Sequence, residues 1–412
     1  MSFSAWNKSK LGDICDITSS KRIYASEYCE TGIPFFRGKE IIEKFRDQAV
    51  STELFITCER YVELNNKFGS PTFGDILLTS VGTLGVPYFV LNETFYFKDG
   101  NLTWFRNFRE CNSKFIYLWL QSPQSQNQIL GKSIGSTQKA LTIDILKKFD
   151  INLPPLNEQK TIMSILSSID EKIKINNRIN DNLAMQVYAI FKSWFVDYEP
   201  FSNSQFIFTD EGNIPAKWKI TNLESCCSLI VKGITPRYSD FGDQKVINQK
   251  CIRNGTIDLQ LARKHIPKVV NEKWLKFGDI LINSTGEGTL GRVAQVCFTP
   301  TNLVADSHVT IIRPSSYNLI HYLGCLLLTK QSEFEGMASG STGQTDLPRD
   351  LLKGMSVVVP DEKVLESFSR IVSPLRQKII ALQEENINLV SVRDVLLPKL
   401  MSGEIDVSQI SN

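Results

Sequence analysis

Two similar stretches of sequence decide the fold of this chain: FGDILLTSVGTLG at residues 73–85 and FGDILINSTGEGTLG at residues 277–291. The second begins 204 residues after the first and, because it is two residues longer, ends 206 residues after it. The separation of 206 residues persists as far as Pro154 and Pro360, and it is half of the chain length of 412 residues. The sequence therefore predicts two tandem copies of one fold.

Each stretch is typical of a short buried strand that a Gly-Asp turn opens and a glycine turn closes. Apolar residues resume after each glycine turn, as VPYFVLN and RVAQVCF, and predict a further strand. NSKFIYLWLQSP (from Asn112) and YNLIHYLGCLLLTK (from Tyr317) then predict helices packed on a sheet. We expect an α+β fold with two strand-rich domains related by pseudo-two-fold symmetry. A duplicated fold whose loops drifted without function would leave the same repeat.

A long helix with a heptad seam follows each domain. Mostly apolar residues recur at alternating spacings of four and three, the a/d pattern of coiled coils. In the first copy the seam is Ile162, Leu166, Ile169, Ile173, Asn176, Asn180, Leu183, Val187, Ile190 and Trp194. In the second copy it is Phe368, Val372, Leu375, Ile379, Leu382, Asn386, Leu389, Arg393, Leu396 and Leu400. Two such stripes in one chain are most economically buried against each other, so we expect an antiparallel coiled coil that separates the domains.

Asparagines interrupt this seam at residues 176, 180 and 386. Polar seam residues commonly fix the register of a coiled coil at a cost in stability. A solvated or partner-facing stretch of helix is the alternative. The first seam covers 33 residues, about 50 Å at ~1.5 Å per residue, which is longer than one DNA turn of roughly 34–36 Å.

Prolines mark the predicted ends of the two helices. Pro154 and Pro155 precede the first helix, for which Asn157 is the predicted N-cap. Pro398 is expected to kink or end the second helix. The predicted division is a first domain at 1–153, a helical region at 154–200, a second domain at 201–359 and a second helical region at 360–412.

The composition is that of an ordinary globular protein, with 42% hydrophobic and 22% charged residues. It excludes wholly disordered and fibrous proteins. The formal net charge of +2 neither favours nor excludes nucleic acid as a partner. The nine cysteines form no C-x-x-C pair, and no apolar stretch approaches the ~20 residues of a membrane helix. We therefore expect free thiols in a cytoplasmic protein without a membrane partner.

The sequence contains no catalytic constellation that we can assign. Gly286–Gly291 matches the G-x-G-x-x-G pattern of dinucleotide sites, but a predicted strand follows it where such a site requires a helix. The three histidines, His265, His308 and His321, do not have the spacing of metal ligands. We predict no catalytic residue, no metal and no cofactor in this chain, and we favour recognition as its role.

An ordered set of motifs resembles the specificity subunits of type I restriction–modification systems over essentially the whole chain. The set comprises FGDIL and GTLG in both copies, a GST…Q…L loop before LPPLNEQ, the helix end FKSWFVDYEPF and the final LLPKLMSGEIDV. The second copy departs from it where Pro360-Asp361-Glu362 replaces the PPLNEQ helix start.

The resemblance implies a non-catalytic subunit that reads double-stranded DNA. Each domain would be a target recognition domain for one part of a split, asymmetric sequence, and the helical pair would set the spacer. Two modification subunits would dock on the helices and bring S-adenosylmethionine for adenine methylation. Restriction subunits would add ATP and magnesium for translocation and cleavage.

Polar residues in equivalent turns are the candidate DNA contacts. Arg and Gln can pair with base edges, whereas Lys and Ser suit phosphates. The candidates of the first copy are Arg37, Lys39, Ser80, Thr83, Gln138 and Lys139. Those of the second copy are Asn248, Lys250, Ser284, Thr285, Arg292, Gln344 and Thr345. For each of them a solvated turn is the alternative.

Two other functions stay open at this point. The first is a scaffold that binds protein or carbohydrate through its duplicated domains and uses the helices as a spacer. The second, a self-contained methyltransferase or nuclease, is disfavoured by the missing motifs. DNA binding that depends strongly on salt would separate the DNA reader from the scaffold.

Overall fold

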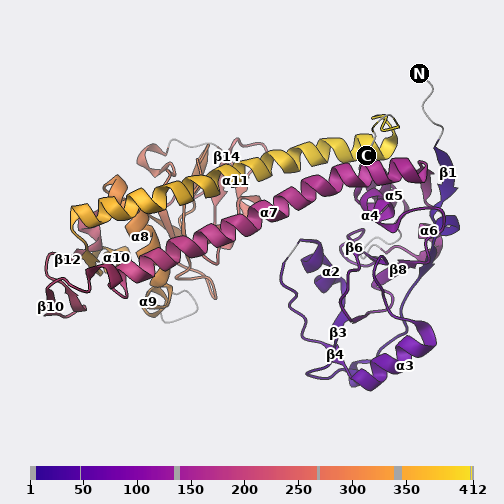
Figure 1. Ribbon diagram of the computed structural model, residues 1–412, viewed down its shortest axis with the longest axis horizontal. Coiled ribbons are helices and arrows are strands. Elements are labelled where there is room, and N and C mark those ends of the chain that lie inside the picture. The colour runs from indigo at the N-terminus through magenta and orange to yellow at the C-terminus, as the bar shows by residue number, and fades with distance from the viewer. Residues whose placement is uncertain are drawn as a thin grey trace. The chain divides into compact units, whose positions relative to one another are not determined.

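The computed structural model describes residues 6–46, 48–133, 140–266, 270–337 and 346–408, and residue 410. The chain divides into two compact units, which we call unit 1 (Met1–Lys174 with Ile387–Asn412) and unit 2 (Ile175–Asn386). Two long helices, α7 (Leu156–Phe195) and α11 (Glu362–Ser402), each contribute one part to unit 1 and one part to unit 2 (Figure 1). The division into four segments stays a prediction.

The described residues of unit 1 form three small sheets. The largest is antiparallel and has the order β2-β8-β5-β6: β2 (Asp16–Thr18), β8 (Leu102–Arg106), β5 (Ile76–Thr79) and β6 (Pro87–Phe89). The second has the order β4-β3-β7: β4 (Phe55–Ile56), β3 (Ile33–Phe36) and β7 (Tyr96–Phe97), with β3 and β7 parallel. The third pairs β1 (Asn7–Lys10) with β9 (Asp150–Leu153).

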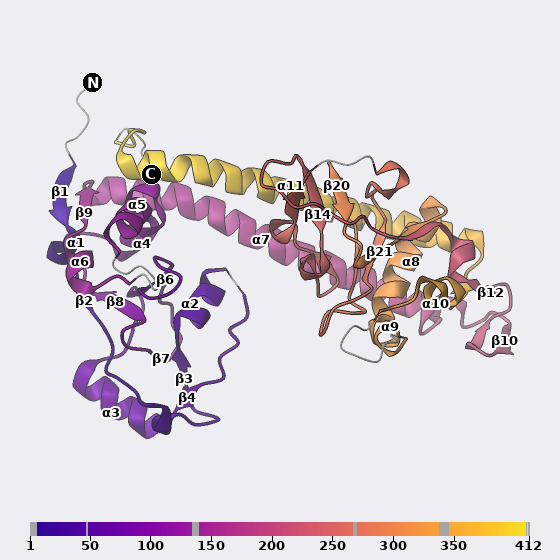
Figure 2. The same ribbon diagram turned by 180° about the vertical axis from the view of Figure 1, so that it is seen from behind.

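Unit 2 repeats these three sheets in the same strand order. Its four-stranded sheet is β13 (Cys227–Lys232), β21 (Val309–Pro314), β18 (Ile280–Asn283) and β19 (Val293–Gln295). Its three-stranded sheet is β17 (Arg263–His265), β14 (Gln244–Ile247) and β20 (Leu303–Ala305), again with one parallel pair, β14 and β20 (Figure 2). The third pairs β12 (Lys219–Asn222) with β22 (Ser356–Val359). Unit 2 adds β10 (Phe206–Thr209) with β11 (Gly212–Pro215), and β15 (Ile252–Arg253) with β16 (Thr256–Ile257). The tandem α+β repeat is confirmed.

The Gly-Asp pair explains why the two quoted stretches are alike. Gly74 and Gly278 have φ angles of +90° and +88°, which a residue with a Cβ adopts only with strain. Each glycine also donates a backbone hydrogen bond that joins the turn to the segment after the next strand, to Val90 and Val296 respectively. The aspartate that follows each glycine accepts a backbone N–H three residues upstream, at 2.9 Å in unit 1 and 2.8 Å in unit 2. The motif is therefore a turn that starts the central strand.

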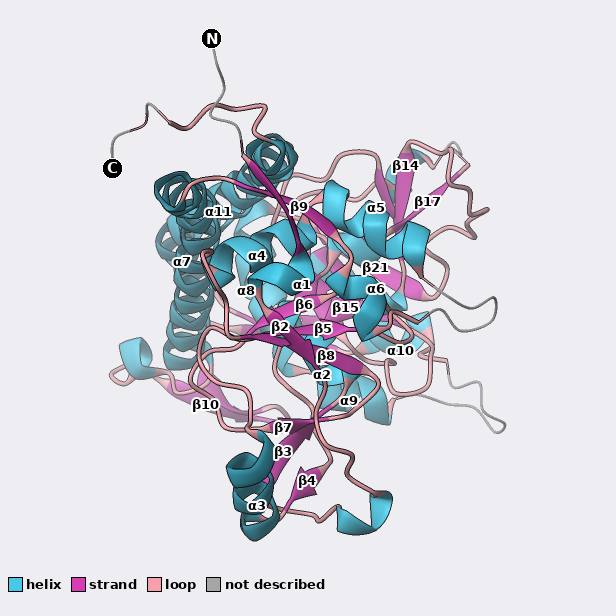
Figure 3. Cartoon of the chain, turned by 90° about the vertical axis from the view of Figure 1, so that its right-hand side faces the viewer, coloured by secondary structure: helices cyan, strands magenta, loops and turns pink. Residues whose placement is uncertain are grey.

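The predicted helices pack on one side of each four-stranded sheet. In unit 1 these are α4 (Ser113–Gln121) and α5 (Pro123–Lys132) (Figure 3). Phe115, Trp119 and Ile129 of these helices lie fully buried in the same core as strand β5. In unit 2 they are α8 (Tyr317–Thr329) and α9 (Gln331–Gly336). The remaining helices of eight residues or more are α2 (Gly38–Phe45) and α3 (Cys58–Phe68), both in unit 1.

In unit 2, the second part of α7 packs against the first part of α11. Phe368 of α11 lies with its ring centroid 6.4 Å from that of Phe191 and 4.9 Å from that of Phe195, both on α7. Further along, Asn176 of α7 meets Asn386 of α11. Residue numbers rise on one helix as they fall on the other, so the predicted antiparallel packing is confirmed in this unit.

Unit 1 shows the same direction. Its core contains Ile162 and Leu166 of α7 together with Leu400 of α11, and Asp170 of α7 forms an ion pair with Arg393 of α11. None of the twenty seam residues in the two helices is exposed; all are buried or half-buried. Among the described residues, no helix combines the length and the apolar character that a membrane span requires.

One prediction about the helix ends is wrong, and a second holds to within about one helical turn. Asn157 is not an N-cap, because α7 begins at Leu156 and the Pro155 carbonyl already accepts the N–H of Gln159. Pro398 does not end α11, which continues to Ser402 and stops before Gly403, whose φ is +76°. Proline removes one backbone donor, yet the last turn of a helix can continue when its residues pack, and Leu400 and Met401 are buried in the core of unit 1.

A polar layer interrupts the helix pair in unit 2. The Asn176 side chain donates to Glu385 and to Asn386, both at 2.9 Å, and Asn386 donates to Asn177 at 2.8 Å. A shift in register would break these bonds, which supports the predicted role of the asparagines. Asn180 lies one turn further along α7, and none of the described residues donates a hydrogen bond to its buried side-chain carbonyl oxygen.

Replacing Asn180 with leucine is expected to raise the free energy of unfolding by about 1 kcal/mol, because a buried carbonyl without a partner is removed and a seam position becomes apolar. Urea unfolding of the purified chain measures the change. Asn182→Leu, on the exposed side of the same helix, is the matched control and should leave stability within about 0.5 kcal/mol. A destabilised Asn180→Leu variant would mean that the side chain has a partner.

Candidate nucleic-acid interface

The turn that follows the central strand is built identically in the two units. A serine follows the central strand in each unit, β5 or β18. Its backbone N–H donates to a carbonyl just before the neighbouring strand of the sheet, β8 or β21, and its carbonyl accepts a backbone N–H from a leucine later in the chain. In unit 1 these bonds are Ser80 to Asn101 (2.8 Å) and Leu141 to Ser80 (2.9 Å). In unit 2 they are Ser284 to His308 and Leu347 to Ser284, both 2.8 Å.

The side chains of these two serines face the interior. Ser80 Oγ lies 2.5 Å from Thr103 Oγ1, and Ser284 Oγ lies 2.5 Å from Thr310 Oγ1. Both serines are buried, with 2% and 0% of their surface exposed. The expectation that Ser80 and Ser284 touch DNA is therefore corrected: a hydroxyl that bonds a neighbouring strand inside the sheet does not reach a ligand on the surface.

Three polar side chains from separate segments meet beside this turn in unit 2. Thr285 Oγ1 lies 2.8 Å from His308 Nδ1 and accepts a hydrogen bond of 2.7 Å from Gln249 Nε2. Gln249 also donates to the Thr285 carbonyl. Gln249 follows β14, Thr285 follows β18 and His308 precedes β21. His308 is exposed, whereas Gln249 and Thr285 are half-buried beneath it.

Two aspartates hold the backbone of this cluster, Asp306 through its carboxylate and Asp346 through its own backbone. Asp306 is buried and accepts the His308 N–H at 2.9 Å. Burial raises the pKa of the Asp306 carboxyl above its ordinary value, and the hydrogen bond from the His308 backbone opposes this rise. Asp346 pairs with Thr285 in a single antiparallel bridge and receives Lys232 Nζ at 2.8 and 2.9 Å. The loop geometry is thus fixed before any ligand binds.

The other predicted contacts of unit 2 lie nearby in sequence and have distinct surroundings. Asn248 caps a 3-10 turn through a 2.9 Å bond from the Lys250 N–H, and it is half-buried. Lys250 is exposed. Arg292 donates to the Gly288 carbonyl at 2.7 Å across the glycine turn. Of the three, Lys250 offers the cation that is most accessible to a phosphate.

Unit 1 brings its candidates to the equivalent turns. Arg37 forms an ion pair of 2.7 Å with Glu40, a carboxylate with no exposed surface, so part of its donor capacity is used inside the protein. Lys39 and Thr83 are exposed. Gln138 and Lys139 of the first copy, and Gln344 and Thr345 of the second, lie outside the described residues and stay predictions.

Positive charge is concentrated in unit 2 when the segment before the FGDIL motif is compared between the two units. Residues 237–276 of unit 2 carry nine Lys and Arg against four Asp and Glu, whereas residues 21–70 of unit 1 carry eight of each. A local excess of this kind attracts phosphate even when the net charge of the chain is small. Within the described ranges, no group of three or more His, Cys, Asp or Glu is arranged to hold a metal ion.

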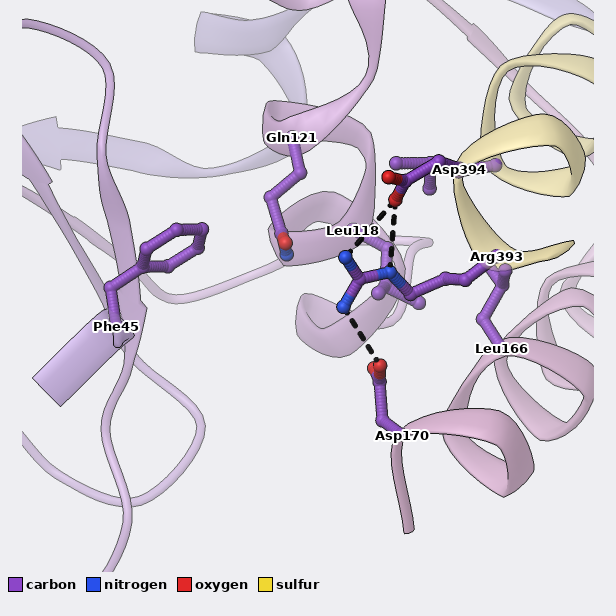
Figure 4. Close-up of a pocket in the computed structure, with 8 residues that line it drawn as sticks. Phe45, Leu118, Gln121, Leu166, Asp170, Arg393 and Asp394 are labelled. Atoms are coloured by element: carbon purple, nitrogen blue, oxygen red, sulfur yellow. Dashed lines mark hydrogen bonds and ion pairs between the residues drawn. The ribbon is translucent and has the colours of Figure 1, made fainter. Parts of the chain in front are cut away.

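A small pocket in unit 1 lies where α4, α7 and α11 meet (Figure 4). Arg393 points into it and bonds Asp170 at 3.3 Å and Asp394 at 3.0 Å, while Phe45 and Gln121 line its other side. Both carboxylates come from the helices themselves. The pocket therefore contains an interhelical ion pair at a seam position, and its chemistry is structural.

Reasoning from the sequence missed Gln249 and His308. Gln249 lies between two residues that were named, and the prediction skipped it. His308 lacks the spacing of a metal ligand and reads from the sequence as an ordinary surface or core histidine, because nothing in the sequence shows that its carbonyl pairs with Ser284.

Comparison with known proteins agrees on one family. The family model described as "Type I restriction modification DNA specificity domain" matches residues 4–185. The MjaIX specificity subunit of a type I restriction enzyme from Methanocaldococcus jannaschii is 27% identical over 98% of this chain and 94% of its own length. The HindI specificity subunit from Haemophilus influenzae is 22% identical over 71% of this chain and 77% of its own. The crystal structure of a type I S subunit from M. genitalium superposes with a TM-score of 0.54 at 17% identity, over 96% of both chains, and shows a similar fold.

Proposed function

The chain belongs to the family of type I restriction–modification specificity subunits, and from this premise we propose that each of its units reads one half of a bipartite, asymmetric DNA target. Its role is recognition, and it is not an enzyme by itself. The observation that carries the proposal is one framework that is present twice with different polar side chains at the same turns. Two different half-sites require two different reading surfaces on one scaffold.

The helices α7 and α11 set the distance between the two half-sites that the units read. Their antiparallel pairing and the polar layer at Asn176 and Asn386 define one register. A defined register gives a fixed spacer, because slipping by one heptad changes helix overlap by about 10 Å at ~1.5 Å per residue. That is roughly three base pairs of DNA, taking 34–36 Å for 10–10.5 base pairs.

We infer that partner subunits supply the chemistry. Modification subunits, two in number, would dock on the long helices, bring S-adenosylmethionine and extrude the target adenine from the duplex. Restriction subunits would bring ATP and magnesium. On α7 within unit 2, Met185 and Tyr188 are exposed by 64% and 53%, and such apolar surface is suited to a helix-bound partner.

The test is a genome-wide map of methylated adenines in a host that expresses the modification subunit with and without this chain. A split motif should appear only when this chain is present. Exchanging residues 1–153 for those of another specificity subunit should change one half of the motif and leave the other half unaltered.

The control is the modification subunit paired with a different specificity subunit, which shows that it is active. If that control methylates DNA and this chain produces no motif, the proposal fails and the scaffold function is favoured. DNA binding by the assembled complex should also weaken steeply as salt rises, because released counterions drive phosphate contacts.

A further inference from the structure

The backbone allows the two reading surfaces to be compared residue by residue. The backbone N–H of Lys98 donates to the Phe36 carbonyl at 2.9 Å in unit 1, and the backbone N–H of Asp306 donates to the Ile247 carbonyl at 2.9 Å in unit 2. These bonds place the residues after β3 and β14 in correspondence, so Gly38 corresponds to Gln249. The backbone hydrogen bonds from Ser80 to Asn101 and from Ser284 to His308 show that Asn101 corresponds to His308. The β-bridges from Val81 to Ala140 and from Thr285 to Asp346 show that Val81 corresponds to Thr285.

The side chains at the matched positions are different in kind. Unit 1 has Gly38, Val81 and Asn101, where unit 2 has Gln249, Thr285 and His308. In unit 1, a Cβ on Gly38 would meet Thr79 at 3.9 Å, an ordinary van der Waals contact, so crowding at this position does not require glycine. The hydrogen bonds of the framework are therefore shared, whereas the side chains at these three matched positions differ between the units.

His308 is the outermost member of its set. Its ring is exposed while Nδ1 is engaged by Thr285, and Thr285 is itself fixed by Gln249 and by the bridge to Asp346. Among the described residues, Nε2 makes no hydrogen bond. An imidazole that is held at one nitrogen and open at the other is oriented in advance, which reduces the entropy lost when a ligand binds.

We propose that His308 is a base-reading side chain of unit 2, with Thr285 and Gln249 as its positioning residues, and that Asn101 occupies the corresponding reading position of unit 1. The proposal rests on the function proposed above and names the side chains that carry it out. Nε2 of an imidazole can bond the N7 or O6 edge of a purine in the major groove, and an asparagine amide suits adenine. Different residues at one framework position would then read different bases in the two half-sites.

The experiment uses the complex of this chain with its modification subunit. Binding is measured on duplexes that carry the wild-type methylation motif and on duplexes with single base changes in each half. His308→Asn, which installs the residue of unit 1, should reduce discrimination at one base of one half-site by roughly 10- to 100-fold and leave the other half unchanged. Asn101→His should do the same for the opposite half.

Thr285→Val installs the residue that unit 1 has at the matched position and tests positioning. It should reduce discrimination at the same base position as His308→Asn. The double variant should discriminate as well as His308→Asn alone, because Thr285 acts through the His308 ring. Additive losses would instead mean that Thr285 contacts DNA independently.

Lys217→Asn is the control, because Lys217 is an exposed cation of unit 2 outside this cluster. It should leave the motif unchanged. Thermal unfolding of His308→Asn should match the wild type, since His308 is exposed. If wild type gives a bipartite motif and folded His308→Asn gives the same motif with the same discrimination, this inference is wrong while the proposed function stands. If wild type gives no motif, the proposed function itself has failed.

Discussion

Replacing Phe368 with alanine is expected to lower the free energy of unfolding by about 3–5 kcal/mol. Phe368 is fully buried, and its ring lies against Phe195 at 4.9 Å and Trp194 at 6.0 Å between centroids. Truncation removes this aromatic contact between α11 and α7 and leaves a cavity that these large rings cannot fill without shifting. Because a domain is commonly stable by only about 5–15 kcal/mol, unit 2 should be close to unfolding.

Urea unfolding monitored by tryptophan fluorescence is a suitable measurement, because Trp194 and Trp218 belong to the same aromatic core. Phe208→Ala provides the matched control, since it is the same substitution in the same unit at a side chain that is 89% exposed. The control should change stability by no more than about 0.5 kcal/mol. Equal stability of the two variants would show that α11 does not pack on α7 through Phe368.

The long-period features of this protein could be predicted from its sequence, and the reason is geometric. A seam residue recurs about once per helical turn, so each of the ten seam residues from Ile162 to Trp194 independently indicates the same buried face. The Gly-Asp turn is equally local, because a positive φ at Gly74 or Gly278 restricts the residue type directly. Patterns that many neighbouring residues report together leave little freedom for an alternative fold.

The direction of a single side chain after a strand is not determined locally. Ser80 follows β5 in a predicted turn, and only the position of Thr103, 23 residues later, shows that its hydroxyl faces the sheet. Asn157 has the residue type of an N-cap, yet Pro155 already supplies the first helical carbonyl. His308 joins Gln249 and Thr285 only after two strands are in place, so the cluster depends on tertiary structure.

The aspartate of the repeated FGDIL motif has a different partner in each unit. In unit 2, Asp279 forms a bidentate ion pair with Arg313, with Nε–Oδ1 and Nη2–Oδ2 distances of 2.7 Å, and its carboxylate has no exposed surface. Arg313 also donates to the carbonyls of Glu272 and Trp274. In unit 1, Asp75 accepts hydrogen bonds from the Thr72 N–H and from Trp104 Nε1, both at 2.9 Å.

Asp279→Asn is therefore expected to lower the free energy of unfolding by about 3–5 kcal/mol, because the Arg313 guanidinium, whose side chain is only 14% exposed, would lose its carboxylate partner. Asp75→Asn, the same substitution at the matched position, should cost only about 1 kcal/mol, since an amide oxygen can still accept from Thr72 and Trp104. Burial also raises the pKa of the Asp75 carboxyl, against the opposing hydrogen bonds from Thr72 and Trp104, so loss of its charge removes a desolvated anion. Urea unfolding of both variants in one buffer gives the two costs. If the aspartate served only the turn that both units share, the two costs would be equal. Unequal costs would mean that the motif aspartate stabilises unit 2 mainly by holding Arg313.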